Sequence, residues 1–472
     1  MKKSLIALTF VAGGILSAQT TSKEILDQLD SESAEYGKIA HSIWSFAEMG
    51  YQEEKSVALL EKTLKEEGFK IEDGVAGMPT AFIATYGSGS PVIAVLGEYD
   101  ALPGLSQKAV AHKESMGAVA GHACGHHLFG TASTAAAIAM KDYLKANGKL
   151  GTIKFYGCPA EEGGSGKVYL TREGMFDGVD VALNWHPGNK NAANPGAALA
   201  NKSAKFRFHG VSAHAAAAPE KGRSALDAVE AMNYMVNMMR EHVPMESRIH
   251  YVITDGGKAP NVVPDYAEVY YYARHPQRDV VVDIFDRMVK AAEGAALGTG
   301  TTMDYEMIGG THELLPNLTL QKLMYDNLKE VGGYTYTAEE KAFAEEISKS
   351  LNLSLDMSNV EGVEEFDPNA KPGGSTDVGD VSFTIPTVGM SAATWVPGTS
   401  AHSWQAVAAG GMSIGEKGMM VAAKTIALTG MDLIDNPELV AAAKKEFLEK
   451  RGDDFIYTPL LGDRKPALNY RD

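Results

Sequence analysis

The chain has 472 residues, of which 45% are hydrophobic and 22% charged, and its formal net charge is −17. This length allows two or three domains with a large buried core, and the composition is that of an ordinary soluble globular protein. The acidic balance argues against nucleic-acid binding, which requires a basic face.

The first eighteen residues have the pattern of a secretory signal peptide. Lys2 and Lys3 precede an apolar run over 5–16, and Ser17-Ala18 supplies small residues for cleavage. The apolar run is short for a membrane span, although an uncleaved anchor is the alternative interpretation. No later segment approaches the apolar length of a membrane helix, so we expect a periplasmic or secreted protein without a membrane span.

Helices and strands alternate along the next part of the chain. The predicted elements are helices over 24–65 and 127–146 and strands over 80–86, 91–97, 152–158 and 179–185. Such alternation predicts an α/β sheet that is largely parallel and covered by helices on both faces.

From about residue 202 the order of elements changes. The expected elements are strands over 205–209, 248–254, 266–274 and 301–307 and helices over 224–242 and 278–296. This βαββαβ order is typical of a ferredoxin-like domain. The α/β pattern then resumes with a helix over 318–331, a strand over 385–391 and a helix over 410–428. We therefore expect a catalytic domain formed by 19–201 and 313–435, an inserted domain over 202–312, and a charged, peripheral tail over 436–472.

Polar side chains follow several predicted strands at the points where these strands end. Glu98 and Asp100 follow the strand over 91–97, and Glu161-Glu162 follow the strand over 152–158. His186 ends the next strand, and His402 lies in the loop beyond the last one. Because sites in open α/β sheets form beyond the carboxyl ends of strands, these residues predict a shared cleft.

Cys124-Gly125-His126 stands just before the alanine-rich helix. Thiolate, imidazole and carboxylate groups bind Zn²⁺ and related metals, and a helix N-terminus lowers the pKa of a thiol. The alternative is that Cys124 is only a buried small residue, but the neighbouring His122 and His127 weigh against this. Cys158 is the other cysteine of the chain, and a disulfide between the two stays open.

Glu161 and Glu162 are adjacent, so their side chains point in different directions. One can bind a metal ion while the other reaches a water molecule, as a hydrolase requires. His186 and His402 are weaker signals when taken singly, because a lone histidine is more often an ordinary core or surface residue.

Several motifs resemble those of metallopeptidase family M20, on its aminoacylase and amidohydrolase branch. They cover almost the whole mature chain and are found at residues 97–104, 121–133, 157–167, 184–187, 214, 222–228, 259–264 and 373–380. The resemblance implies a zinc-peptidase-like (phosphorylase/hydrolase-like) α/β catalytic domain with an inserted ferredoxin-like dimerisation, or lid, domain.

The resemblance also implies the roles of individual residues. Two divalent metal ions, Zn²⁺ or Mn²⁺, are expected at a set of five ligands: Cys124, His126, Glu162, His186 and His402. Glu161 matches the general base. In the inserted domain, His214 matches a histidine that reaches the other subunit's site, and Asn261 and Arg274 match residues that hold the substrate. By themselves these last three are indistinguishable from ordinary surface or turn residues.

Two positions depart from the family pattern. Glu98 stands where many family peptidases have a histidine, two residues before Asp100, which leaves metal binding by Glu98 open. His127 stands where related sequences have Asp or Asn, and it is an extra ligand, a supporting residue or a substrate contact.

The expected activity is hydrolysis of the amide bond of an N-acyl or N-aroyl amino acid, with a p-aminobenzoyl-glutamate-like compound as the nearest candidate. The expected assembly is a homodimer or a heterodimer with a related chain. A dipeptidase or carboxypeptidase of the same fold is one alternative. A binding or partner subunit that needs a second chain for activity is the other.

Overall fold

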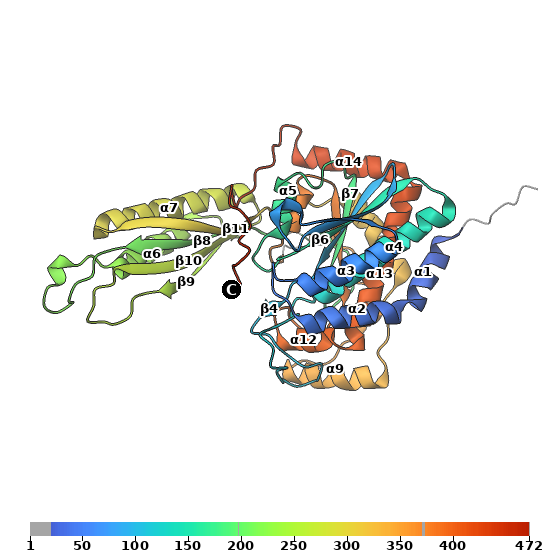
Figure 1. The fold of residues 1–472 in the computed structure, drawn as a ribbon, viewed down its shortest axis with the longest axis horizontal. Helices are drawn as coiled ribbons and strands as arrows, with labels where there is room; N and C mark the ends of the chain where they lie inside the picture. Colours follow the sequence, from blue (N-terminus) through green and yellow to red (C-terminus); the bar gives the residue numbers. More distant parts are fainter. Residues whose placement is uncertain (1–19, 197, 371–372, 472) are drawn as a thin grey trace, which may run out of the picture.

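The computed structural model describes residues 20–196, 198–370 and 373–471, so the predicted signal segment 1–18 lies outside the described residues. The described residues form a broad α/β domain and a smaller domain that projects from one side of it (Figure 1). The chain enters the smaller domain at β8 and leaves it after β11. Among these residues, no helix has both the length and the apolar character needed to cross a membrane.

The larger domain is built on a six-stranded sheet with the order β1-β2-β6-β3-β7-β12. Its strands are β1 (Lys70–Asp73), β2 (Phe82–Ser88), β3 (Val92–Glu98), β6 (Gly151–Cys158), β7 (Val181–Gly188) and β12 (Thr387–Ala393). The strands β6, β3, β7 and β12 are parallel, and β1 and β2 are antiparallel at one edge. The predicted parallel sheet is therefore confirmed for four strands. The short and mostly exposed β1 has no apolar run that could have predicted it.

Helices cover both faces of this sheet. They are α1 (Ser22–Ser31), α2 (Ser33–Phe46), α3 (Glu54–Glu66), α4 (His126–Asn147), α5 (Gly166–Arg172), α8 (Leu318–Val331), α9 (Ala338–Ser350), α10 (Ser358–Glu361), α11 (Val378–Ser382), α12 (Trp404–Gly410), α13 (Ser413–Asp435) and α14 (Pro437–Arg451), with a short 3-10 turn η1 (Val75–Gly77) and a two-stranded ribbon of β4 (Leu102–Pro103) and β5 (Ala120–Gly121). The alanine-rich α4 packs directly on β3, because a Cβ at Gly130 would lie only 2.6 Å from the carbonyl oxygen of Glu98. This close packing fixes the N-terminus of α4 near the end of β3.

The smaller domain is a four-stranded antiparallel sheet with the order β11-β8-β10-β9. Its elements are β8 (Ala200–His209), η2 (Pro219–Lys221), α6 (Ala225–Met239), η3 (Arg240–His242), β9 (Arg248–Asp255), β10 (Tyr266–His275), α7 (Arg278–Thr299) and β11 (Thr302–Thr311). The two helices pack against each other and against β8 and β10, over a core that includes Phe206, Phe208 and Phe285. The ferredoxin-like βαββαβ prediction is confirmed. We call this the lid domain.

Two predicted segments differ from the structure. The helical stretch over 24–65 consists of three helices, because Ala47 takes a left-handed conformation (φ 46°) that ends α2. The tail was expected to be peripheral, and this is wrong. Its first part is α14, which packs on α8, and the residues after it return to the junction of the two domains, where Leu461 is buried.

Candidate metal centre

A cleft of about 680 Å³ lies beyond the carboxyl ends of the parallel strands. On the catalytic side it is lined by Cys124, Glu161, Glu162, His186 and His402, and on the lid side by residues of β8, β10 and β11, including Arg274. The strand ends predicted from sequence therefore do meet in one cleft. The lid domain forms its other wall.

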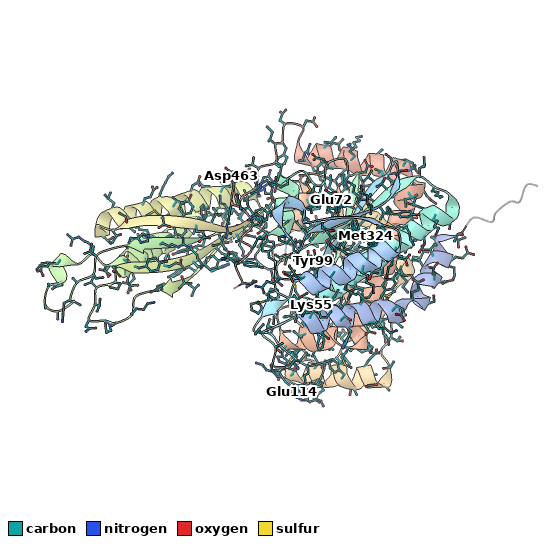
Figure 2. All side chains as sticks on the ribbon, viewed as in Figure 1. Lys55, Glu72, Tyr99, Glu114, Met324 and Asp463 are labelled. Atoms are coloured by element: carbon teal, nitrogen blue, oxygen red, sulfur yellow. The ribbon has the colours of Figure 1, made fainter. Side chains whose placement is uncertain are left out.

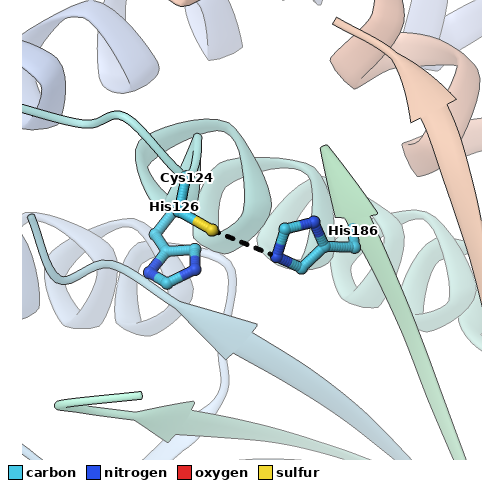
Figure 3. A group of neighbouring side chains, drawn as sticks. All are labelled: Cys124, His126 and His186. Atoms are coloured by element: carbon cyan, nitrogen blue, oxygen red, sulfur yellow. Dashed lines mark hydrogen bonds between the residues drawn. The ribbon is translucent and has the colours of Figure 1, made fainter. Parts of the chain in front are cut away.

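The N-terminus of α4 brings the first candidate ligands together (Figure 3). The Sγ atom of Cys124 lies 3.5 Å from Nε2 of His186, and one ligand atom from each of Cys124, His126 and His186 lies within 4.8 Å of the others. Gly125, between Cys124 and His126, has φ 78°, a conformation that glycine adopts without strain. A Cβ there would also lie 2.6 Å from the Pro187 side chain, so this turn requires glycine.

A second group shares Cys124. The Nε2 atom of His402 lies 3.1 Å from Oε1 of Glu162, and both form a possible ligand group with Cys124. The left-handed conformation of His402 (φ 60°) is uncommon for a residue other than glycine, and its N–H donates to the carbonyl of Ala123 at 2.9 Å. One thiol common to two groups is the arrangement expected for a bridging ligand between two ions.

The donor atoms of the centre fit a metal. His126 Nδ1 donates to Asp100 Oδ1 at 2.8 Å, and His186 Nδ1 donates to the carbonyl of Pro187 at 2.8 Å, so both Nε2 lone pairs are directed into the centre. His126 Nε2 and Glu162 Oε1 are buried and have no hydrogen-bond partner within the described residues. Buried polar atoms without a partner are rare in proteins, and a bound cation would satisfy these. The S, N and O donors suit Zn²⁺ or Mn²⁺.

The turn that carries Glu161 and Glu162 is held from inside the domain. The N–H of Ala160 donates to Oε1 of the buried Glu53 at 2.8 Å, and the N–H of Glu162 donates to Asp100 Oδ2 at 2.9 Å. Asp100 therefore supports both His126 and Glu162 and uses both of its carboxylate oxygens to do so. This places Asp100 behind the candidate ligands rather than among them.

Glu161 lies in a strongly acidic environment. Burial raises the pKa of its carboxyl well above the usual value, and the negative charges of Glu98, Glu162 and Asp377 raise it further, against the effect of His126. A carboxylate with a raised pKa is a stronger base, which suits proton abstraction from water. The same negative surroundings favour the binding of divalent cations.

The structure separates the two positions that depart from the family pattern. Oε2 of Glu98 lies 3.0 Å from His126 Nε2 without a hydrogen bond, and Glu98 forms a possible ligand group with His126 and Glu161. His127 instead points away, and its Nε2 donates to the carbonyl of Gly410 at 3.0 Å. His127 is thus a buried packing residue between α4 and α12, and burial lowers its pKa well below the usual value.

Sequence reasoning missed a buried ion cluster behind the centre. The ammonium of Lys167 lies 2.6 Å from Glu98 Oε1 and 2.6 Å from Asp377 Oδ1, and all three side chains are almost fully buried. The available signal was a lysine that opens an otherwise apolar helix, directly after a glycine-rich loop. Lys167 holds one oxygen of Glu98, and the other oxygen is left facing His126.

The lid residues expected to hold substrate are not together. Arg274 lines the cleft, donates to Ser375 Oγ at 3.3 Å and lies over the ring of Tyr272, and its Nε atom is buried without a partner among the described residues. His214 and Asn261 are exposed and neighbour each other at another part of the lid, outside this cleft. His214 Nδ1 accepts from the N–H groups of Ala216 and Ala217, so its Nε2–H faces outward as a donor.

Cys124 and Cys158 are both free thiols in the structure. Cys158 is buried at the end of β6 and donates to the carbonyl of Tyr156 at 3.3 Å. Burial raises the pKa of Cys158 to about 12, so this thiol stays protonated at neutral pH. It has no place among the candidate ligands.

Metal binding at this centre should release protons and weaken as the pH falls. Burial raises the pKa of the Cys124 thiol well above its usual value, although His126 opposes the shift, so the metal-free thiol is protonated between pH 6 and 8. Because the metal binds the thiolate, each proton displaced raises the apparent affinity about tenfold per pH unit. Zn²⁺ titration calorimetry in buffers of different ionisation enthalpy measures both quantities. An affinity that is independent of pH would contradict Cys124 as a ligand.

Comparison with known proteins identifies the family. Residues 200–299 match the peptidase dimerisation domain. The chain is 41% identical to a p-aminobenzoyl-glutamate hydrolase chain of Escherichia coli that is named as one subunit of that enzyme, over 93% of this chain and 98% of that protein. It is 30% identical to the Xaa-Arg dipeptidase of Mus musculus, over 89% of this chain and 90% of that protein. The fold is similar to that of a dinuclear metal-binding peptidase of the M20 family from Bacillus subtilis (TM-score 0.58, 17% identity, 88% of this chain and 99% of that one). The chain is therefore a hydrolase that belongs to the M20 peptidase family.

Proposed function

We propose that this protein is a metal-dependent amidohydrolase that cleaves the amide bond of an N-acyl or N-aroyl amino acid carrying a free carboxylate, such as p-aminobenzoyl-glutamate. The observation that carries the proposal is Arg274, a cation with no ion-pair partner in the described chain, on the wall opposite Cys124 and Glu162. A guanidinium binds a carboxylate in a bidentate manner. The name of the Escherichia coli relative, a p-aminobenzoyl-glutamate hydrolase, supports the substrate class.

In this proposal Cys124, His126, Glu162, His186 and His402 hold two divalent ions, Zn²⁺ or Mn²⁺. When bound, the ions would polarise the scissile carbonyl and lower the pKa of a water molecule. Glu161 accepts the proton from water and delivers it to the leaving amine. Arg274 orients the substrate through its carboxylate, so that the amide lies beside Glu161.

Turnover of a matched substrate pair tests the proposal. The purified chain without residues 1–18 is assayed on p-aminobenzoyl-glutamate and on the corresponding glutamate diamide, which lacks both carboxylates, after its metal content has been measured. We expect turnover of the acid with a much higher KM for the diamide, and Arg274→Gln should remove most of that difference. Equal KM values for the acid and the diamide in the wild-type protein would contradict the role of Arg274.

Two other activities have specific support. The 30% identity to an Xaa-Arg dipeptidase favours hydrolysis of dipeptides with a free amine. The name of the Escherichia coli relative describes one subunit of an enzyme, which favours a requirement for a second chain. The same assay separates them: turnover of Xaa-Arg dipeptides alone supports the first, and bound metal without turnover of any substrate supports the second.

We further propose that two subunits complete each site, with His214 of one subunit donating to the carbonyl oxygen of a substrate bound by the other. This accounts for the exposed position of His214 outside its own cleft and for the dimerisation domain. Asn261, beside His214, would contact the substrate from the same side.

Mixing two inactive variants should therefore restore activity. Glu161→Gln and His214→Ala homodimers are each impaired, but a mixed dimer has one site with neither change. Random re-formation makes half of the dimers mixed, so activity should return to about a quarter of the wild-type value. The measurement is turnover after the two variants are dissociated and re-formed together. No recovery, with mixed dimers shown by mass spectrometry, would place His214 in its own subunit's site or outside catalysis.

Residues 1–18 support a further proposal, that the protein is exported and cleaved near Ala18. N-terminal sequencing of the protein from a periplasmic or culture fraction tests this. An intact Met1 in the cytoplasmic fraction alone would contradict it.

A further inference from the structure

Residues 453–471 follow α14 and run along the junction between the catalytic domain and the lid. Asp463 of this segment is labelled there in Figure 2, and the end of the chain lies beside β11 in Figure 1. At its start, Tyr457 donates to Asp380 Oδ1 at 2.7 Å, and the carbonyl of Thr458 accepts from His312 Nε2 at 2.9 Å. The segment is thus attached to the catalytic domain next to the end of the lid.

The middle of the segment is bound to both domains. The guanidinium of Arg464 donates to the carbonyl of Ile308 and lies 3.3 Å from Glu306, both on the lid strand β11. The carbonyl of Arg464 accepts from Arg172 at 2.7 Å, and the carbonyl of Lys465 accepts from Tyr169 at 3.2 Å, both on α5. These contacts fix the path of the chain toward the cleft.

The segment ends on a candidate metal ligand. The hydroxyl of Tyr470 donates to the backbone carbonyl of Glu162 at 3.1 Å, and the guanidinium of Arg471 donates to the same oxygen. The ring of Tyr470 packs edge-on against Tyr51, with ring centres 5.6 Å apart. A Cβ at Gly50 would lie 2.2 Å from the Tyr470 hydroxyl, so glycine is needed for this approach.

The Glu161–Glu162 turn requires such support. Gly163 and Gly164 follow it, and Gly163 has φ 91°, so the turn is followed by backbone with little intrinsic stiffness. Glu53 and Asp100 hold the turn through N–H groups from inside the domain. Tyr470 and Arg471 hold it through a carbonyl from outside, more than three hundred residues away in the sequence.

We propose that residues 453–471 form a strap that positions the Glu161–Glu162 turn, so that Tyr470 and Arg471 are positioning residues for the metal ligand Glu162. The catalytic consequence rests on the proposed function, whereas the effect on metal binding does not depend on the substrate. Supporting residues behind a metal ligand typically change metal affinity by about 10- to 100-fold when they are removed.

Metal titration of strap variants tests the proposal. The variant Tyr470→Phe/Arg471→Ala removes both donors and keeps the aromatic ring on Tyr51. Lys465→Ala is the matched control, because it removes a cation from the same segment without touching the turn. Metal-free proteins are titrated with Zn²⁺ against a chromophoric chelator, their thermal unfolding is followed without metal, and kcat and KM are measured on p-aminobenzoyl-glutamate.

We expect the double variant to bind Zn²⁺ at least about tenfold more weakly than wild type. Its kcat should fall more than its KM changes, and its metal-free Tm should stay within about 2 °C of wild type, while Lys465→Ala matches wild type throughout. Arg471→Lys, which keeps a donor, should recover part of the affinity.

Wild-type Zn²⁺ affinity in the double variant would overturn the proposal. If the double variant loses affinity and also a large part of its metal-free stability, Tyr470→Phe alone decides, because it removes only one hydroxyl. Weaker Zn²⁺ binding by that single variant supports the strap, and unchanged binding overturns it. Failure of the proposed function would be seen separately, as no turnover by the wild-type protein with its metals bound.

Discussion

Replacing Glu161 with Gln should reduce kcat by about a thousandfold or more while both metal ions stay bound. Glutamine has the size of glutamate but cannot accept a proton, and general-base catalysis typically contributes about 10²–10⁴-fold. The raised pKa of the Glu161 carboxyl, caused by burial and by the charges of Glu98, Glu162 and Asp377, makes it a strong base in this position. Steady-state kinetics and elemental analysis of the same preparation measure the two effects.

The adjacent residue supplies the matched control. Glu162→Gln changes the same group one position along the chain, where the carboxylate oxygen Oε1 lies 3.1 Å from His402 and forms a possible ligand group with Cys124. We expect Glu162→Gln to lose metal as well as turnover. If the two variants behave alike, either both losing metal or both keeping it, the division of roles between Glu161 and Glu162 is wrong.

Replacing Lys167 with Met should lower the free energy of unfolding of the catalytic domain by about 3–5 kcal/mol. The ammonium of Lys167 is fully buried between Glu98 and Asp377, at 2.6 Å from each. Without it, two buried carboxyl groups lose the cation that compensates them, and this cost is larger than the worth of an exposed ion pair. Urea denaturation of the metal-free protein reports on this domain, because Trp44, Trp185, Trp395 and Trp404 all lie within it.

Two variants show whether the uncompensated charge is the cause. Adding Glu98→Gln and Asp377→Asn to Lys167→Met should recover most of the loss, because no buried charge of the cluster then stays without its partner. Lys23→Met removes a lysine that pairs with Asp27 on the surface, and its denaturation midpoint should match wild type. If Lys167→Met is as stable as Lys23→Met, the cluster does not stabilise the fold.

The sequence by itself predicted the architecture because the two domains have different local patterns. Apolar strand runs such as 152–158 and the alanine-rich helix before 146 identify a parallel sheet whose strands are buried on both faces. The βαββαβ order of the lid is likewise a succession of local periodicities. Where this local signal is weak, as in the exposed β1, or where one residue such as Ala47 breaks a helix, the prediction failed.

The candidate ligands were also accessible from sequence, because topology brings strand ends together. Glu162 and His186 end neighbouring regions of one sheet, so their residue types and positions sufficed to predict a shared cleft. The role of His127 was not accessible in this way. Its neighbour His126 faces the centre, but only the packing of α4 against α12 shows that His127 donates to Gly410 instead.

The tertiary structure alone decided what supports the centre. Lys167 and Asp377 are 210 residues apart in the chain, and Glu162 and Arg471 are 309 apart. No local pattern encodes such pairs, because a hydrogen bond or an ion pair depends on positions in space that many other elements determine together. The sequence thus determined the fold class, the strand-end residues and the donor chemistry. The folded chain determined which of these residues face one another, which carboxylate is compensated by a buried lysine, and which distant segment holds the metal-binding turn.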